Sequence, residues 1–357
     1  MPSITFQLET VTPLFLSGAD QAIAELRPPA FRGALRYWFR AIVGAYCWNN
    51  IAQLKNIESS LLGDAGESGG SKIIVRLKQV PDPLPFNSVR FNQDQDPGLS
   101  YLWFSMKRSG GRNSKPARQA IGVENPLKFS LSFSTRPNPT KSLKQQQKDL
   151  LIAANCFWLT VNLGGFGSRE RRGAGSLRVT QIQCQDIDEN ELPKFRMNYK
   201  EDAVLKFLRG ELSKARRNCY QLLGFDTENL PTIDQLPDLE ICGKYTSRIY
   251  LLKEPYTSWQ EVLEDIGVKY KNYRQNLGLE KRAIFGLPLK DFDMESRRPS
   301  PLRIKVIRSL DRYYCVLIQI KAKFPESSRI DNPNNPSYRS MNEFIASFSE
   351  DEIERVG

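Results

Sequence analysis

The chain contains no histidine among its 357 residues. Histidine is the side chain that most often moves protons near neutral pH and the commonest transition-metal ligand. Its absence excludes Ser-His-Asp and Cys-His catalysis, histidine acid–base pairs and most transition-metal sites. An enzyme built on this chain would need carboxylates, lysine, tyrosine or a borrowed metal. We therefore expect no resident metal and no cofactor.

Cysteine pairs and long apolar runs are also missing. The six cysteines are scattered with no CxxC spacing, which disfavours a zinc site and is typical of buried small hydrophobes. No apolar run reaches the roughly 18 residues of a membrane-spanning helix. Residues 1–4 do not begin the charged-then-apolar pattern of a signal peptide. We expect a cytoplasmic protein that does not use a membrane as its partner.

The chain has fewer acidic than basic residues. Fifty-one Lys and Arg against forty Asp and Glu give a net charge of +11. Such an excess favours an anionic partner, with nucleic acid ahead of an anionic membrane surface. A basic helix on a membrane is the weaker alternative, because its apolar face is needed by a core.

The sequence GGFGSRERRGAG at residues 164–175 is the most informative segment. Five glycines and three arginines in twelve residues do not form a helix or an ordinary strand. Arginine brings a fork of donors that matches phosphate, so the segment predicts a loop lying against a polyanion. Tight turns between a helix and a strand are the alternative, although folding does not require three arginines there. The predicted contacts are Gly165, Gly167, Ser168, Arg169, Arg171 and Arg172.

A helix with a basic stripe is predicted from about residue 30 to 48, opened by Pro28-Pro29. Arg32, Arg36 and Arg40 recur every four residues and share one face beside an apolar one. A solvated basic face is the alternative. Arg27 and Arg32 stand at the positive end of the helix dipole, where a bound phosphate would offset their repulsion. We expect these four arginines and the glycine-rich loop to converge on one trough for a sugar–phosphate strand.

The predicted order of elements defines the fold class. Alternation predicts strands at 3–12, 72–78, 128–134 and 176–184, with helices at 30–48 and 143–162. Strand, helix, strand, strand, helix, strand is the ferredoxin-like order. Later helices are predicted at 200–223, 258–276 and 339–355, with a hairpin at 302–309 and 313–324. We predict an α+β protein of tandem ferredoxin-like (RRM-like) domains, at 1–187 and 188–357.

A long, basic, proline-rich insertion is expected at about 81–125 in the first domain. Lys107, Arg108 and Arg112 surround its Gly110-Gly111 pair, and Arg297-Arg298 forms a second basic pair before the hairpin. A solvated loop is the alternative for Arg297-Arg298, as it is for the pair Lys281-Arg282. Single-stranded RNA also uses aromatic platforms, but core packing is the favoured role for most of the available rings. Those rings are Phe31, Tyr37, Phe166, Tyr270 and Tyr273.

Three blocks resemble one known family. Residues 10–20, followed by ELRPPAFRGALRYWFR at 25–40, are similar to the start of a RAMP-superfamily CRISPR protein. The glycine-rich loop resembles the G-rich loop of that superfamily. Residues 286–288 and 297–302 resemble its C-terminal motif in the largest RAMP subunit of the type III-B (Cmr) effector complex. We recognise no such resemblance in the insertion or in residues 188–280.

The resemblance implies tandem ferredoxin-like domains, assembly with other RAMP subunits, and binding of guide and target RNA near the guide's 3′ end. It implies a non-catalytic subunit that aids target capture in antiviral defence. The alternative is a RAMP-type endoribonuclease in which Asp20 promotes attack by the RNA's own 2′-OH. The favoured interpretation of Asp20 is a turn residue after Gly18-Ala19.

Overall fold

The N-terminal half forms a four-stranded antiparallel sheet with the order β2-β5-β1-β6. The computed structural model describes residues 1–21, 23–48, 50–66, 69–90, 94–107, 116–137, 140–226, 235–289, 293–328 and 330–357. The strands of this sheet are β1 (Ser3–Thr10), β2 (Ile73–Lys78), β5 (Lys128–Thr135) and β6 (Leu177–Gln185). Helices α1 (Pro28–Cys47) and α2 (Ile51–Leu62) connect β1 to β2, and α4 (Leu143–Asn162) connects β5 to β6. The strands and helices predicted in this half are confirmed.

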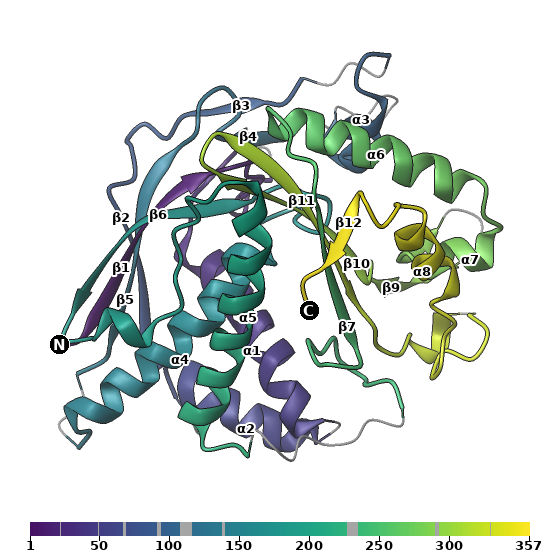
Figure 1. Ribbon diagram of the computed structural model, residues 1–357. Coiled ribbons are helices and arrows are strands. Elements are labelled where there is room, and N and C mark those ends of the chain that lie inside the picture. The colour runs from purple at the N-terminus through teal and green to yellow at the C-terminus, as the bar shows by residue number, and fades with distance from the viewer. Residues whose placement is uncertain are drawn as a thin grey trace.

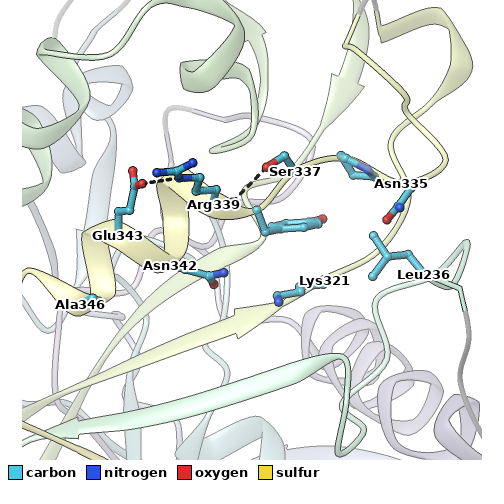
Figure 2. Close-up of a pocket in the computed structure, with 10 residues that line it drawn as sticks. Leu236, Lys321, Asn335, Ser337, Arg339, Asn342, Glu343 and Ala346 are labelled. Carbon is cyan, nitrogen blue, oxygen red and sulfur yellow. Dashed lines mark hydrogen bonds and ion pairs between the residues drawn. The ribbon is translucent and has the colours of Figure 1, made fainter.

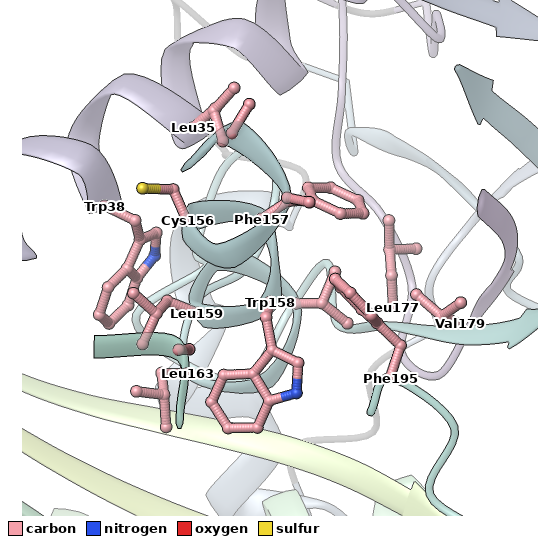
Figure 3. Close-up of a cluster of buried hydrophobic side chains, with 14 of the residues drawn as sticks. Leu35, Trp38, Cys156, Phe157, Trp158, Leu159, Leu163, Leu177, Val179 and Phe195 are labelled. Carbon is pink, nitrogen blue, oxygen red and sulfur yellow. The ribbon is translucent and has the colours of Figure 1, made fainter. Parts of the chain in front are cut away.

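Local sequence accounts for these elements. Ile4, Phe6 and Leu8 of β1 are buried on one face, as the period of a strand requires. Helix α4 begins with a capping box made by Ser142 and Gln145. Every residue of α4 from Leu150 onward is buried, because this helix is packed on more than one side. Figure 3 shows Phe157, Trp158 and Leu159 of α4 among side chains from α1 and β6.

The insertion contains regular structure in its described part. It forms β3 (Phe86–Ser88), α3 (Pro97–Leu102), the 3₁₀ helix η1 (Phe104–Met106) and β4 (Gln119–Ile121). Helix α3 lies beside α6 (Trp259–Gln275) of the other half (Figure 1). Arg108 and Arg112 lie outside the described residues.

The C-terminal half builds a second antiparallel sheet with the order β10-β11-β7-β12. Its strands are β7 (Ser247–Leu252), β10 (Leu302–Ser309), β11 (Arg312–Ile320) and β12 (Ile353–Arg355). Helix α6 follows β7 and α8 (Arg339–Ala346) precedes β12. The remaining elements are η2 (Glu189–Glu191), α5 (Glu201–Leu223), α7 (Leu279–Ala283), β8 (Leu287–Leu289), β9 (Asp293–Arg298) and η3 (Glu326–Ser328).

The two sheets share one spatial order of strands. If the strands of each sheet are numbered along the chain, that order is second, third, first, fourth. The helices predicted at 200–223 and 258–276 are confirmed, and so is the hairpin, although its second strand ends at Ile320 instead of residue 324. The helix predicted at 339–355 is wrong beyond Ala346. There the hydroxyl of Ser347 donates back to the carbonyl oxygen of Phe344, and a turn at Ser349 leads into β12.

One hydrophobic core connects the two halves. Helix α5 packs along α4, and Ile249, Val316 and Ile318 of the second sheet belong to the same buried cluster as Ile4 and Phe6. Helices α1, α4 and α5 therefore fill the space between the sheets (Figure 1). The opposite face of the second sheet packs against α6 and α8. The division at 187 and 188 stays a prediction, and packing is continuous across it.

Within the described ranges, no helix is both long enough and apolar enough to cross a lipid bilayer.

Candidate nucleic-acid interface

The backbone of the glycine-rich loop is fixed by three parts of the chain. The N–H of Ser168 donates to the carbonyl oxygen of Phe15 at 2.9 Å, and the N–H of Gly175 donates to that of Pro13 at 2.8 Å. From the second sheet, the N–H of Ile304 donates to the carbonyl oxygen of Arg171 at 3.1 Å. From the insertion, Nε1 of Trp103 donates to that of Arg172 at 2.8 Å. The loop thus joins both halves.

The glycines of the loop allow this close backbone packing. Gly167 has a φ of +83°, and a Cβ there would stand 2.4 Å from the carbonyl oxygen of Phe15. At Gly175 a Cβ would stand 1.9 Å from that of Phe166. These glycines approach their own protein rather than an external polyanion. The predicted phosphate contact of the loop therefore depends on its arginine side chains.

Six arginines line one cavity of about 690 Å³, which we call the arginine cavity. The glycine-rich loop, α6, α7 and the end of β9 contribute them. No described residue that lines this cavity is an aspartate or a glutamate. The arginines are Arg169, Arg172, Arg274, Arg282, Arg297 and Arg298.

The positive charge of the arginine cavity is incompletely compensated. Burial and the nearby Arg172 lower the pKa of Arg169 to about 10, and burial also lowers the pKa of Arg172. Nε and Nη2 of Arg298 and Nε of Arg274 are buried without a hydrogen-bond partner among the described residues. An anion that entered the cavity would stabilise these cations through its charge.

A second cavity of about 430 Å³ adjoins the first and shares Arg169, Arg172, Pro299 and Ser300 with it. Gly167, Ser168 and Arg171 also line this second cavity. Nη1 of Arg118, from the insertion, donates to the Ser168 hydroxyl at 3.1 Å. The structure therefore gathers most of the predicted loop residues and Arg297-Arg298 along two adjoining cavities.

Beneath these cavities, the buried carboxylate of Glu240 holds several cationic groups. Arg171 donates to both of its oxygens at 2.7 and 2.9 Å, and Nη1 of Arg298 stands 3.5 Å away. Nη2 of Arg303 stands 3.7 Å away, and the Tyr37 hydroxyl donates at 2.5 Å. Burial alone would raise the pKa of Glu240, but Arg171, Arg303 and Arg298 hold it at about 2. Arg171 is thus a structural ion-pair residue.

The arginines of α1 do not join this site, so the prediction of a single trough is wrong for them. Arg36 and Arg40 both pair with Glu58 of α2, at 2.8 and 3.0 Å. Arg36 also donates to the carbonyl oxygens of Leu62 and Gly63. The carboxylate of Glu58 and carbonyl groups at the C-terminus of α2 therefore already bind Arg36 and Arg40.

The N-terminal end of α1 faces a different cavity. Arg27 stands 3.4 Å from Glu25. Arg32 is exposed and lines, with Arg36, a cavity of about 620 Å³ that shares no residue with the two described above.

The other predicted residues are placed as follows. Lys107 is half-buried, and burial lowers its pKa. Asp20 is exposed and precedes Gln21, whose side-chain oxygen accepts from Arg118. Asp20 is not among the residues that line the two adjoining cavities. The candidate aromatic platforms Phe31, Phe166 and Tyr270 are buried in the core, as favoured.

Sequence reasoning missed Arg274 and left Arg282 out of the predicted site. Arg274 belongs to the helical pattern of α6 and carries no local signal of binding. Its Nη1 donates to the Tyr101 hydroxyl at 2.8 Å, which ties α6 to the insertion. Arg282 adjoins Lys281 before the FGLP segment at 285–288, a basic pair visible in the sequence.

A cavity of about 570 Å³ in the C-terminal half has a different character. It lies beside α8 and includes Lys321, Asn335 and Asn342 (Figure 2). Arg339 at its rim is 83% exposed at the side chain and pairs with Glu343 at 2.8 Å. Its charge is mixed, so it is a weaker anion site than the arginine cavity.

The comparisons with known proteins all indicate the same family. The model of the RAMP superfamily matches residues 7–178. The CRISPR system Cmr subunit Cmr1-2 of Pyrococcus furiosus is 34% identical over 193 residues, which cover 50% of this chain and 95% of that protein. Subunit Cmr1-1 of the same organism is 26% identical over 322 residues, covering 85% and 82%.

Solved structures show the same fold. The crystal structure of Cmr1 from Pyrococcus furiosus in its apo form has a TM-score of 0.70 at 22% identity, covering 100% of this chain and 99% of that one. A chain of the type III-B Cmr-beta complex bound to cognate target RNA has a TM-score of 0.59 at 13% identity, covering 92% and 97%. The resemblance of the three sequence blocks is confirmed. The chain belongs to the RAMP superfamily and, within it, to the Cmr1 family.

Proposed function

We propose that this chain is the Cmr1-type subunit of a type III-B CRISPR effector complex, and that it binds guide and target RNA near the guide's 3′ end without cutting either. In this role it aids capture of target RNA in antiviral defence, in the cytoplasm and together with other RAMP subunits. The names of its relatives support the complex, and the arginine cavity supports RNA as the ligand.

The observation that carries the proposal is a cavity with six arginines and no described acidic side chain. Guanidinium groups bind phosphate through paired donors, so such a surface recognises a nucleic-acid backbone by charge and shape. Arg169 and Arg172 come from the first half, and Arg274, Arg282, Arg297 and Arg298 from the second. A strand held there contacts both halves of the molecule.

We further propose that each half is a ferredoxin-like domain. The strand–helix–strand–strand–helix–strand order and the shared side-by-side order of strands support this. The insertion within the first domain adds α3, which packs against α6, and the short helix η1.

The experiment is a pull-down of the tagged chain from its native host, with sequencing of the RNA that co-purifies. We expect short RNAs that share a repeat-derived 5′ tag, together with other RAMP subunits. An R282A/R297A variant should retain the protein partners, while ultraviolet crosslinks between RNA and this subunit should disappear. Arg339→Ala is the control. Wild-type crosslinks confined to other surfaces would contradict the proposal.

Absence of catalysis is part of the proposal, and Asp20 provides its test. The purified chain should leave single-stranded RNA intact in the presence of Mg²⁺. Metal-dependent cleavage that Asp20→Ala abolishes would replace this proposal with the endoribonuclease alternative.

A further inference from the structure

The insertion places an exposed aromatic ring at the rim of the arginine cavity. Phe104, in η1, is 64% exposed and lines the cavity together with Tyr101. The three sequence blocks that resemble the family do not include this segment.

The segment that presents Phe104 is firmly held. Its neighbours Leu99, Leu102, Trp103 and Met106 are buried against the second half. The carboxylate of Glu264 in α6 accepts the backbone N–H groups of Gly98 and Leu99, each at 2.9 Å. The segment around Phe104 is thus packed, while the Phe104 side chain itself stays exposed.

A guanidinium group already stacks on this ring. The Cζ atom of Arg169 lies 4.5 Å from the ring centroid of Phe104. The hydroxyl of Ser105 accepts from Nε and Nη2 of Arg169, at 2.8 and 2.5 Å. Because Ser105 is neutral, it orients the guanidinium without cancelling its charge. A flat ring and a flat cation are therefore held together at the entrance to the cavity.

We propose that an unpaired nucleobase of bound RNA stacks on the Phe104–Arg169 pair, while its phosphates contact the arginines behind it. Aromatic rings and guanidinium planes both stack on nucleobases, and only an unpaired base can offer its full face. This inference depends on the proposed RNA-binding function and adds a contact to the base. The insertion then selects single-stranded over fully paired RNA at this point.

The test compares Phe104→Ala with wild type by fluorescence anisotropy. The two probes are a single-stranded oligoadenylate and an oligomer of the same length whose ribose–phosphate units carry no bases. We expect Phe104→Ala to weaken binding of the oligoadenylate roughly 5- to 150-fold, the range for loss of one base stack. Binding of the base-free oligomer and the salt dependence should not change. Phe104→Tyr should restore the affinity.

The matched control is Tyr245→Ala. Tyr245 is 62% exposed, carries Lys244 Nζ at 5.5 Å from its ring, and does not line the arginine cavity. Equal affinity of Phe104→Ala and wild type for the oligoadenylate overturns the stacking proposal. An equal loss on the base-free oligomer also overturns it, because Phe104 would then only orient Arg169. If the wild-type protein binds neither probe, the proposed RNA-binding function is wrong, and the stacking proposal is wrong as well.

Discussion

At the scale of single residues, buried charge determines which arginines are structural and which are available to a ligand. Glu240 neutralises Arg171 and accepts two hydrogen bonds from it, and Glu58 forms ion pairs with Arg36 and Arg40. Arg169 has neutral partners in Ser105 and Phe104. The sequence alone does not distinguish paired from available arginines, because the carboxylates that pair with them come from distant segments.

Substitution of Glu240 by glutamine should destabilise the fold. Arg171, Arg298 and Arg303 would lose the Glu240 carboxylate in a buried setting, and breaking a buried pair costs about 3–5 kcal/mol. Arg171 and Arg303 keep Glu170, at 3.4 and 2.6 Å. Urea denaturation at pH 7 measures the loss, with the exposed Glu254→Gln as control. A change of less than about 1 kcal/mol would contradict the role of Glu240 as the centre of this cluster.

The pH dependence of that stabilisation follows from the pKa of Glu240. Its value of about 2 in the folded protein lies below the roughly 4.3 of an unfolded chain. The contribution is therefore fully present above about pH 4.3 and is lost as pH falls toward 2. The gap in unfolding free energy between wild type and Glu240→Gln should narrow over this window. A gap that stays constant from pH 5 to about pH 2.5 would refute the assignment.

Buried Lys305 should destabilise the fold, whereas Glu240 stabilises it, and its effect depends on pH in a higher range. Its Nζ is buried without a hydrogen-bond partner among the described residues, and burial lowers its pKa to about 7. Between that value and the roughly 10.4 of an unfolded lysine, the unfolded chain binds more protons, so stability rises with pH. Lys305→Met should raise the free energy of unfolding at pH 7 by about 1–3 kcal/mol and flatten this rise. Urea denaturation at pH 7 and 9 measures this effect, with Lys128→Met at an exposed lysine as control. If Lys305 were solvated, Lys305→Met would change the free energy of unfolding no more than the control does at either pH.

At the scale of elements, much of the secondary structure was predictable and its placement was not. Alternation along 3–12 and the apolar pattern of 143–162 determine β1 and α4 locally. Strands β7 and β12 were missed, because short segments gain their strand conformation only by pairing with β11 and with each other. The glycine-rich loop was recognised by composition. Its contacts with the segment that follows β1, with β10 and with the insertion depend on tertiary packing.

The loop provides a prediction at this scale. Gly167→Ala would place a Cβ against the carbonyl oxygen of Phe15 at a positive φ, with an expected destabilisation of about 1–3 kcal/mol and weaker RNA binding. Gly33→Ala is the control, because nothing lies within 4 Å of a Cβ in that exposed turn of α1. It should stabilise the protein by about 0.5–1 kcal/mol. Equal thermal denaturation of the two variants would contradict the packing described for the loop.

At the scale of the whole molecule, the site exists only because two halves and an insertion meet. The first half supplies Arg169 and Arg172, the second half supplies four arginines, and the insertion supplies Phe104. Arg297 and Arg298 were predicted because they adjoin in sequence. Arg274 could not be, since its role comes from the position of α6 beside α3. The basic stripe of α1 was an equally strong signal in the sequence, but the fold places these arginines away from the arginine cavity.

The salt dependence of RNA affinity tests the central claim most directly. Removal of one arginine that binds a phosphate should reduce the slope of log affinity against log salt by about 0.7 on a single strand. A variant with alanine at Arg169, Arg282 and Arg297 should therefore bind single-stranded RNA at least tenfold more weakly, with a slope reduced by up to about 2. Removal of three exposed arginines outside both cavities, Arg76, Arg312 and Arg339, should change neither quantity comparably. Equal reductions in the two triple variants would show that RNA is attracted by net charge alone and that the arginine cavity is not its binding site.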